Sequence, residues 1–349
     1  MIRQNFNADW TVEKGDGNSR MNSFLGNTQT KTVHLPYDAM IHEARTPDTK
    51  NGAQTGFYPG GEYIFQKHFT APQAWQGKPV SLVFEGVYQT ALVYLNGWLL
   101  TRNVNGYAEF TVEAGPYLKY GADNLLKVIA DNSLEPNSRW YTGSGIYRPV
   151  RLLVGNKVYL PQDTVRITTR EADEGFALLD VTAQVQSAST VTERVTLQQT
   201  ICREGTAVLT DRQNLLLQPG ESRTVSFRYC VDSPALWSPE NPNLYTSTMQ
   251  VLEGEEELDR EETSFGIRTL SIDAAHGVRI NGQTVKLRGA CIHHDNGLLG
   301  AVCHPDAVRR KVHILHENGY NAIRSAHNPC SKALLDACDE QGMLVMDEY

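Results

Sequence analysis

The sequence predicts a mainly β protein in which two β-sandwiches precede the beginning of a (β/α)8 barrel. Two observations support this prediction. Up to about residue 272, the chain consists mostly of short runs rich in β-branched and aromatic residues, separated by turns. After about residue 275, short apolar strands alternate with amphipathic helices, which is the pattern of a parallel α/β sheet or barrel.

Length and composition agree with a globular protein of several domains. At roughly 150 residues per domain, the 349 residues suggest two to three domains. A hydrophobic content of 40% and a charged content of 21% exclude disordered and collagen-like chains. The formal net charge of −8 argues against nucleic acid or an anionic membrane as a partner.

The sequence shows no sign of a membrane span or a secretory signal. No apolar run reaches the roughly 18 residues that a membrane-spanning helix needs. The first residues contain no apolar segment of the kind found in signal peptides. The six cysteines form no C-x-x-C pair, so we interpret them as reduced thiols and expect a cytoplasmic protein.

The first predicted domain, residues 1–157, has the strand spacing of a jelly-roll sandwich. Asn96 and Gly97 both tolerate positive φ, so we expect a tight type I′ hairpin between the strand at 91–95 and its return at 98–100. Other runs of strand character cover 81–87, 124–130 and 146–154.

The second predicted domain, residues 158–272, alternates more regularly between apolar and polar residues. This alternation places the apolar side chains of each strand on one face only. A unit of roughly 100 residues built from such strands is typical of an immunoglobulin-like sandwich. The clearest strands cover 179–186, 194–200 and 224–229.

The third predicted domain, residues 273–349, has the order strand, helix, strand, helix, strand. Pro305 favours the start of the first helix, Asn318-Gly319 its end, and Gly342 the end of the second helix. The strands are predicted at 285–290, 321–324 and 343–346. These are the first three βα units of a (β/α)8 barrel, which needs eight strands and roughly 250 residues. We therefore expect an N-terminal portion of a longer enzyme.

Polar side chains follow each of the three predicted parallel strands. The carboxyl ends of such strands meet at one edge, where the functional residues of α/β barrels lie. We therefore predict one site that suits a polar ligand such as a sugar. Its candidate residues are His293 after the first strand, Arg324, His327 and Asn328 at the second, and Asp347 and Glu348 after the third.

Two other kinds of site are weighed against this one. His293, His294 and Asp295 could suggest a metal site, but adjacent residues of an extended chain face opposite sides and make poor joint ligands. We therefore predict no metal site there. Thiols near the same edge could suggest a nucleophile, but no activating arrangement is evident, so we expect buried, inert cysteines at 291, 303 and 330.

Tryptophans could provide platforms on which sugars stack. The ordinary alternative is a buried tryptophan in a core. Both interpretations stay open for Trp98, Trp140 and Trp237.

Several longer motifs carry a resemblance to a known family. They occur in a fixed order along nearly the whole chain. They are RWYTGSGIYR at 139–148, LWSPENPNLY at 236–245, SFGIR at 264–268, LRGA at 287–290, IRSAHNP at 323–329 and LDACDEQGMLVMDE at 335–348. In these motifs the chain resembles the N-terminal part of glycoside hydrolase family 2, and its β-galactosidases most closely.

The resemblance implies a jelly-roll sugar-binding domain, an immunoglobulin-like domain and a catalytic barrel. It implies that His293 and His327, with Asn328, contact sugar hydroxyls, and that Arg324 supports the nucleophilic carboxylate. Asp347 and Glu348 match supporting positions at the third strand. The acid/base and nucleophilic glutamates are expected after residue 349, so we expect no catalytic glutamate and no hydrolysis in the chain itself.

The implied function is that of a retaining exo-glycosidase acting on terminal β-D-galactosides. The alternatives are a β-glucuronidase or another member of the family, a carbohydrate-binding module without catalysis, and a scaffolding protein with a degenerate barrel. We expect a carbohydrate substrate and a homo-oligomer, and no nucleic acid or membrane partner. No cofactor is identifiable, and a structural divalent cation or Na⁺ in the full-length enzyme stays open.

Overall fold

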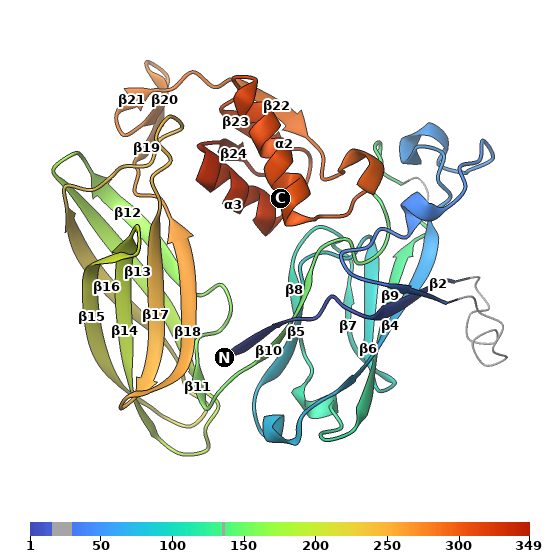
Figure 1. The fold of residues 1–349 in the computed structure, drawn as a ribbon, viewed down its shortest axis with the longest axis horizontal. Helices are drawn as coiled ribbons and strands as arrows, with labels where there is room; N and C mark the ends of the chain where they lie inside the picture. Colours follow the sequence, from blue (N-terminus) through green and yellow to red (C-terminus); the bar gives the residue numbers. More distant parts are fainter. Residues whose placement is uncertain (16–29, 135–136) are drawn as a thin grey trace.

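The computed structural model describes residues 1–15, 30–134 and 137–349 (Figure 1). Two β-sandwiches stand side by side, and a small α/β unit lies across one end of both (Figure 1). This arrangement confirms the predicted mainly β class and the predicted order of the three parts. No helix in the described ranges is long and apolar enough to cross a membrane.

The first sandwich consists of two antiparallel sheets. The larger sheet has the order β3-β2-β4-β9-β6-β7, and the smaller one has the order β1-β10-β5-β8. The larger sheet contains β2 (Trp10–Lys14), β3 (Lys31–Val33), β4 (Gly61–Thr70), β6 (Thr90–Leu95), β7 (Trp98–Asn103) and β9 (Asp123–Asn132). The smaller contains β1 (Ile2–Asn5), β5 (Val80–Phe84), β8 (Phe110–Glu113) and β10 (Val150–Val154). Short 3-10 helices lie in the connections at Met40–His42, Gly52–Thr55, Gln73–Trp75 and Gly115–Tyr117.

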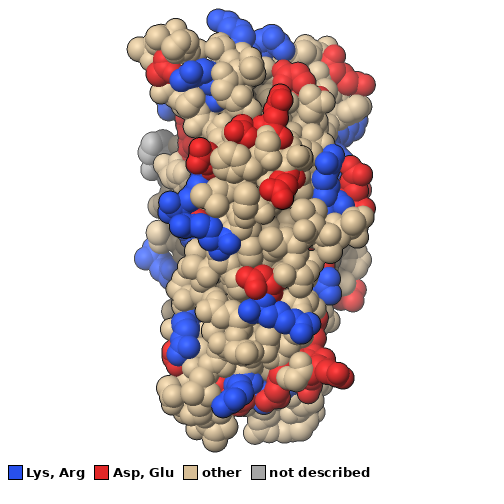
Figure 2. Space-filling model, turned by 90° about the vertical axis from the view of Figure 1, so that its left-hand side faces the viewer, with Lys and Arg blue, Asp and Glu red and all other residues tan. Residues whose placement is uncertain are grey.

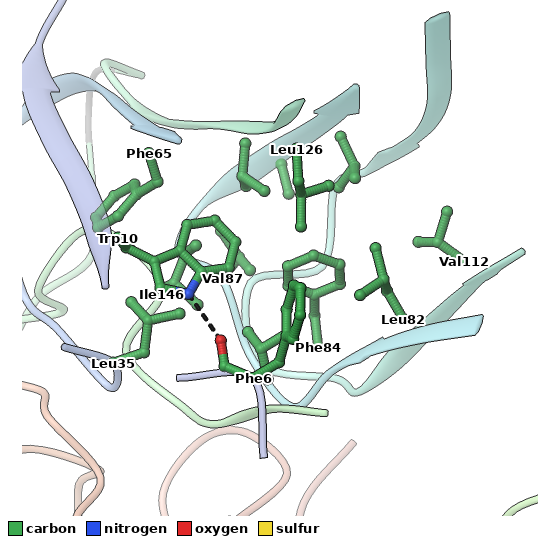
Figure 3. Close-up of a cluster of buried hydrophobic side chains, with 14 of the residues drawn as sticks. Phe6, Trp10, Leu35, Phe65, Leu82, Phe84, Val87, Val112, Leu126 and Ile146 are labelled. Carbon is green, nitrogen blue, oxygen red and sulfur yellow. Dashed lines mark hydrogen bonds between the residues drawn. The ribbon is translucent and has the colours of Figure 1, made fainter. Parts of the chain in front are cut away.

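The core of this sandwich is built around Trp10. Its side chain is fully buried between the two sheets, and its indole N–H donates to the carbonyl of Phe6 at 2.8 Å (Figure 3). A buried indole needs such a partner, because an unpaired N–H in an apolar core costs free energy. The single polar contact therefore lets a large aromatic ring fill the centre of the core.

The hairpin at Asn96 and Gly97 has the predicted geometry. Leu95 pairs with Trp98 across a two-residue turn, and the φ angles of Asn96 and Gly97 are 52° and 90°. Both angles are positive, as a type I′ turn requires. The local sequence was sufficient to predict this turn.

The strand predicted at 146–154 is shorter than expected, since β10 begins only at Val150. Two features of this segment explain why β10 begins late. Pro149 has no N–H for sheet pairing, and the carbonyl of Tyr147 accepts a bond from the backbone N–H of Cys303 at 3.0 Å. Tyr147 therefore bonds to the α/β unit, whereas Ile146 stays in the core of the first sandwich and the Pro149 carbonyl accepts the N–H of Glu85 at 3.1 Å.

The second sandwich also has two antiparallel sheets. In one, β13 pairs with β11, β12 and β16, and the other has the order β15-β14-β17-β18. The strands are β11 (Val158–Tyr159), β12 (Arg166–Ala172), β13 (Phe176–Ser187), β14 (Glu193–Arg203), β15 (Thr206–Leu217), β16 (Ser222–Asp232), β17 (Tyr245–Glu253) and β18 (Glu256–Phe265). Figure 2 shows that basic and acidic side chains are interspersed on the face it presents, so that face carries no large patch of one sign.

The α/β unit follows a small antiparallel sheet of β19 (Leu270–Asp273), β20 (Gly277–Ile280) and β21 (Gln283–Thr284). Its strands form a parallel sheet in the order β22-β23-β24. Its elements are β22 (Gly289–Ile292), the 3-10 helix Gly297–Leu299, α2 (Pro305–Glu317), β23 (Ala322–Ser325), α3 (Lys332–Gln341) and β24 (Leu344–Met346). The predicted helix ends at Pro305, Asn318 and Gly342 are confirmed.

The first parallel strand lies later in the sequence than predicted. The prediction was 285–290, whereas β22 spans Gly289–Ile292. Val285 still belongs to the preceding small sheet, because its N–H donates to the carbonyl of Val278 at 2.8 Å. Parallel pairing with β23 begins only where Gly289 lies opposite Ala322.

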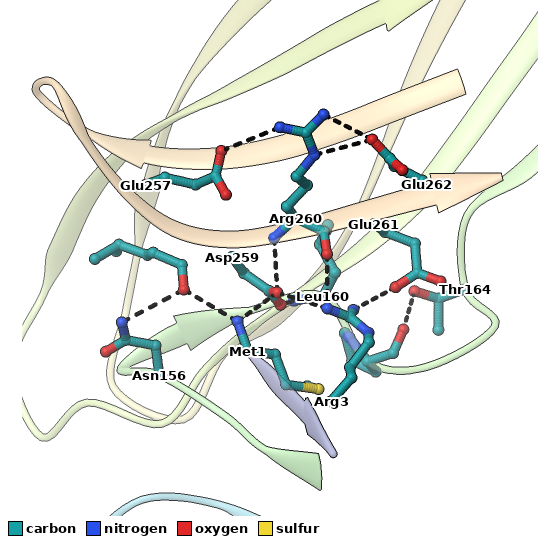
Figure 4. Close-up of polar contacts among 12 residues, drawn as sticks. Met1, Arg3, Asn156, Leu160, Thr164, Glu257, Asp259, Arg260, Glu261 and Glu262 are labelled. Atoms are coloured by element: carbon teal, nitrogen blue, oxygen red, sulfur yellow. Dashed lines mark hydrogen bonds and ion pairs between the residues drawn. The ribbon is translucent and has the colours of Figure 1, made fainter. Parts of the chain in front are cut away.

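The two sandwiches are joined through the buried carboxylate of Asp259 on β18. The α-amino group of Met1 lies 2.6 Å from this carboxylate, and Arg3 lies 3.2 Å from it (Figure 4). The backbone N–H of Leu160 donates to its other oxygen at 2.7 Å. The first strand of one sandwich is thereby tied to the last strand of the other.

The second sandwich contacts the α/β unit through Trp237. This side chain is buried, its N–H donates to the carbonyl of Asp339 at 2.8 Å, and the Arg268 guanidinium lies over its ring at 4.5 Å. Gly342 at the end of α3 lies against Pro239, where a Cβ would come within 2.1 Å of the Pro239 carbonyl oxygen. Trp237 is therefore part of a domain junction.

The first sandwich contacts the α/β unit through the buried carboxylate of Asp38. One oxygen accepts the backbone N–H groups of Met40 and Ser144, each at 3.0 Å. The other accepts the Tyr141 hydroxyl at 2.6 Å and the Ala301 N–H at 2.8 Å. Four donors thus satisfy a carboxylate that has no contact with water, and one of them comes from the α/β unit.

Two glycines make room for this carboxylate. Gly143 has a φ of 70°, and a Cβ there would lie 2.4 Å from Ala301 and 2.7 Å from Asp38. Gly300 has a φ of 65°, and a Cβ there would lie 2.3 Å from Asp38. Both positions need glycine for backbone conformation and for space.

His294 lies at the same junction. Its Nε2 is 2.8 Å from the carbonyl of Thr142 in the first sandwich, so the proton of the neutral ring belongs on Nε2. Burial lowers the pKa of His294 from 6.5 to about 4. The ring is therefore neutral in the folded protein at neutral pH.

We predict that Asp38→Asn destabilises the protein. The amide nitrogen would face two N–H or O–H donors that the carboxylate now satisfies, and we expect the free energy of unfolding to fall by about 2–4 kcal/mol. Urea unfolding followed by circular dichroism measures this. Asp48→Asn, at an exposed position of the same segment, is the matched control and should change little. Equal stability of the two variants would contradict the role assigned to Asp38.

We also predict a pH dependence of stability that comes from His294. The unfolded chain binds a proton at this ring below about pH 6.5, whereas the folded protein does so only near pH 4. The contribution of His294 to stability is thus complete above pH 6.5 and declines as the pH falls from 6.5 toward 4. In His294→Gln, the amide N–H can still donate to Thr142 but does not titrate.

The variant should therefore lose less of its free energy of unfolding between neutral pH and pH 5 than the wild type does. Urea unfolding at the two pH values measures the difference. The control His316→Gln, on the exposed side of α2, should follow the wild type. Parallel pH profiles for His294→Gln and the wild type would show that the ring is not buried as described.

Candidate functional site

The carboxyl ends of β22, β23 and β24 bring the predicted polar residues to one edge of the parallel sheet. Cys291 on β22 pairs with Arg324 on β23, and Arg324 pairs with Met346 on β24. The residues that follow these strands therefore start from adjacent positions. We call the group formed by His293, Arg324, His327 and Glu348 the strand-end cluster.

Arg324 and Glu348 form the charged part of the strand-end cluster. The guanidinium Nε of Arg324 donates to Oε1 of Glu348 at 2.6 Å, and Nη2 contacts the same oxygen. A further guanidinium N–H points to the sulfur of Cys291 at 3.4 Å. These contacts with Cys291 and Glu348 raise the pKa of Arg324, so the guanidinium is a permanent positive charge.

His327 contacts both members of this pair. Its Nδ1 lies 3.1 Å from Oε2 of Glu348 and 3.2 Å from Nη2 of Arg324. A carboxylate oxygen only accepts and a guanidinium nitrogen only donates, so Nδ1 can form a hydrogen bond with one of the two but not with both. With the proton on Nδ1, the ring donates to Glu348, and Nη2 of Arg324, which already contacts Oε1 of Glu348, forms no hydrogen bond with the ring. In the neutral ring, Nε2 then carries a lone pair, and it has no hydrogen-bond partner among the described residues.

His293 has an equivalent arrangement. Its Nδ1 lies 2.6 Å from the carbonyl oxygen of Ala326, which again places the proton on Nδ1. The centroids of the His293 and His327 rings are 6.2 Å apart. The strand-end cluster therefore presents two imidazole Nε2 atoms that can each accept a hydrogen bond.

Trp140 of the first sandwich completes one side of the cluster. Its indole is stacked on the His293 ring, with a centroid distance of 4.7 Å and an interplanar angle of 7°. The same indole lies 5.5 Å from the His327 ring. A residue more than 150 positions away in the sequence thus contacts both histidines.

The two remaining predicted site residues are placed differently. Asn328 is 3% exposed, and its side-chain nitrogen is buried with no hydrogen-bond partner in the described part of the chain. Asp347 accepts the backbone N–H of Cys330 at 3.0 Å and so holds the loop that follows β23. Both lie beside the strand-end cluster rather than in its network of side-chain bonds.

The cysteines do not all follow the expectation of buried thiols. Cys303 is buried and Cys330 is half-buried, and burial raises the pKa of both thiols. Cys291 is exposed, which corrects the prediction. It alternates with residues that face the sheet interior, so its side chain lies on the face that carries Arg324.

Arg148 is a residue of the site whose role the sequence analysis missed. It is 3% exposed, and its guanidinium donates to the carbonyls of Tyr107 at 2.7 Å and Pro329 at 2.9 Å. It therefore fixes the loop that carries His327 and Asn328 against the first sandwich. The motif at 139–148 marked its position but gave no indication of this contact.

The arrangement can bind a polar ligand through neutral acceptors and one fixed positive charge. Within the described ranges, no group of three or more His, Cys, Asp or Glu side chains is arranged to hold a metal ion. The strand-end cluster has one carboxylate in its bonding network, and both oxygens of that carboxylate are already bonded. Binding and orientation are thus the chemistry that these residues supply.

Family models match nearly all of the chain. Residues 10–176 match the model described as glycosyl hydrolase 2 galactose-binding domain-like, and residues 158–268 match that of glycosyl hydrolases family 2. Residues 274–349 match the TIM barrel domain of the same family, which confirms the (β/α)8 prediction for the α/β unit.

Individual proteins give the same result. A β-galactosidase of Bacteroides ovatus is 37% identical over 347 residues, which are 99% of this chain and 41% of that protein. The crystal structure of a glycosyl hydrolase family 2 member from Bacteroides cellulosilyticus has a TM-score of 0.94 at 35% identity, covering 100% of this chain and 46% of the other. That of a β-glucuronidase from Bacteroides uniformis has a TM-score of 0.87 at 27% identity, covering 99% and 42%.

The chain therefore spans less than half the length of these three proteins. It matches them over all of its own parts, from the first sandwich through the parallel strands that carry the strand-end cluster. Together with the three family models, this shows that the chain belongs to glycosyl hydrolase family 2.

Proposed function

We propose that this chain is the N-terminal portion of a retaining exo-glycosidase that hydrolyses terminal β-D-galactosides. The strand-end cluster binds the terminal sugar, and the catalytic acid/base and nucleophile come from parts of the barrel beyond the 349 residues. The relatives support this, because a β-galactosidase matches 99% of the chain and itself extends much further.

The observation that carries the proposal is the pair of Nε2 acceptors on His293 and His327. Each imidazole has its Nδ1 proton bonded within the protein, at Ala326 and at Glu348. Sugar hydroxyls are donors as well as acceptors, so two acceptors at fixed positions suit two hydroxyls of one ring. Such directed contacts fix the orientation of a small polar ligand.

The same acceptors favour a neutral sugar over a uronic acid. An imidazole with its proton on Nδ1 offers only a lone pair at Nε2, so it pairs with a hydroxyl that donates and not with the carboxylate of a uronic acid, which also offers only lone pairs. β-Glucuronidase is the second candidate function, because the β-glucuronidase from Bacteroides uniformis has the same fold over 99% of this chain. The two candidates are distinguished by the activity of the longer protein on β-galactosides and on β-glucuronides.

Glu348 is a supporting residue in this proposal. A retaining mechanism needs two carboxyl groups about 5–5.5 Å apart, one as nucleophile and one as acid/base. One oxygen of Glu348 accepts a hydrogen bond from Arg324, and the other accepts one from His327. Both lone-pair-bearing oxygens are thus engaged within the protein and are not free to attack a sugar. Glu348 orients Arg324 and His327 instead of attacking the sugar.

We therefore predict that the purified 349-residue protein does not hydrolyse 4-nitrophenyl β-D-galactopyranoside. Without both catalytic carboxyl groups, neither the covalent route nor acid assistance is available. Release of nitrophenol is followed against a buffer blank and against an identically purified Glu348→Gln variant. Turnover above the blank that Glu348→Gln abolishes would overturn the supporting role of Glu348.

We further predict that His327→Phe impairs the longer enzyme, in which the barrel is complete. Loss of one bond that strengthens in the transition state costs about 2–4 kcal/mol, which corresponds to roughly 30- to 1000-fold in rate. Both kcat and kcat/KM on a β-galactoside should fall together. His316→Phe on the exposed side of α2 is the matched control and should leave both unchanged.

The competing interpretation is that His327 has only a structural role. It predicts a lower melting temperature with nearly normal kcat in the protein that stays folded. Measuring Tm and kcat on the same preparation separates the two interpretations. Wild-type turnover in His327→Phe would show that this ring does not contact the sugar.

A further inference from the structure

The His293 ring is restrained by two contacts that act in different directions. Its Nδ1–H bond to the Ala326 carbonyl, at 2.6 Å, restrains rotation within the ring plane. The indole of Trp140 lies parallel to the ring at 4.7 Å and 7°, so it prevents tilting out of the plane on that side. The first contact comes from the α/β unit, and the second comes from the first sandwich.

Trp140 is better placed to support the histidines than to bind sugar itself. It is half-buried, one of its faces is covered by His293, and the His327 ring lies 5.5 Å away at an angle of 53°. A platform for a sugar needs an open aromatic face. The face that His293 covers is therefore not available to a sugar, and the indole forms a wall beside both imidazoles.

The position of Trp140 is itself fixed by the residues that follow it. The hydroxyl of Tyr141 donates to the buried carboxylate of Asp38 at 2.6 Å. The carbonyl of Thr142 accepts the bond from His294 at 2.8 Å. The backbone that follows Trp140 is therefore anchored at the junction between the first sandwich and the α/β unit, and the indole extends from the residue just before these contacts.

We propose that Trp140 is a positioning residue of the sugar site: it holds His293 in the ring orientation and tautomer that leave Nε2 free to accept a hydrogen bond from a sugar hydroxyl. The inference rests on the proposed function for the identity of the ligand, but the positioning of His293 is independent of it. The first sandwich thus takes part in sugar recognition without touching the sugar.

The imidazole signals of the 349-residue protein test this positioning directly. Long-range proton–nitrogen NMR spectra at mildly alkaline pH, where an ordinary histidine is neutral, show which nitrogen carries the proton. The His293 signals are identified by their loss in His293→Gln. In the wild type we expect one tautomer, with the proton on Nδ1, and ring protons shifted upfield by the stacked indole.

Three variants distinguish positioning from a general structural effect. In Trp140→Leu the upfield shift should be lost and both tautomers of His293 should be populated. Trp140→Phe keeps an aromatic face, so it should retain the single tautomer with a smaller upfield shift. Trp98→Leu removes a tryptophan that is 65% exposed in the same sandwich, and it should leave the His293 signals unchanged.

The outcomes decide the proposal in either direction. A single Nδ1–H tautomer that persists unchanged in Trp140→Leu would overturn it. If Trp140→Leu does not fold, Trp140→Phe still decides, because an unchanged upfield shift in that variant would show that the indole does not stack on His293. Loss of the tautomer preference in Trp140→Leu, with rescue by Trp140→Phe, would support it.

Binding of methyl β-D-galactopyranoside, measured by the same spectra, gives the functional consequence. Loss of an aromatic pair that orients one acceptor should weaken binding about two- to tenfold in Trp140→Leu, with little change in Trp140→Phe. If the wild type does not bind this probe, the strand-end cluster of the 349 residues does not hold the sugar by itself, while the tautomer measurement still decides the role of Trp140.

Discussion

The carboxylate of Asp38 is the interaction on which the candidate site depends. It is fully buried, it carries a charge in a place without water, and it is stable there only because four donors converge on it. Three of those donors belong to the first sandwich and one belongs to the α/β unit. The bond from Ala301 therefore ties the α/β unit to a carboxylate that the first sandwich already holds in place.

This docking assembles a site from residues that are far apart in the sequence. The strand-end cluster gains its charge and its acceptors from the parallel strands, as expected of an α/β barrel. The first sandwich adds Trp140 beside His293, and Arg148 against the loop that carries His327. The first sandwich, for which the resemblance implies a sugar-binding domain, is in this structure the support for the neighbouring strands.

The features that the sequence predicted correctly are those that local chemistry determines. The turn at Asn96-Gly97 needs two positive φ angles, and the helix ends need a proline or a left-handed glycine, so each is visible in a few adjacent residues. The convergence of Arg324, His327 and Glu348 followed from the topology of parallel strands.

The features that escaped prediction depend on long-range contacts. Asp38 and Ala301 are 263 positions apart, and no local pattern marks either residue as part of a junction. The late start of the strand predicted at 146–154 has in part the same origin, because the Tyr147 carbonyl bonds to the N–H of Cys303 in the α/β unit. The stacking of Trp140 on His293 likewise becomes visible only when the two parts are docked.

The close packing at Gly143 and Gly300 has a consequence for how such proteins can be recombined. A Cβ at either position would collide with the Asp38 carboxylate. The loop that carries Gly143, the carboxylate, and the loop of the α/β unit that carries Gly300 therefore fit together only in this combination. A chimera that combined this α/β unit with a first sandwich from another protein would have to carry Asp38, Tyr141 and Gly143 along with it. In such a chimera, the residues around the Asp38 carboxylate would therefore have to be exchanged as one set.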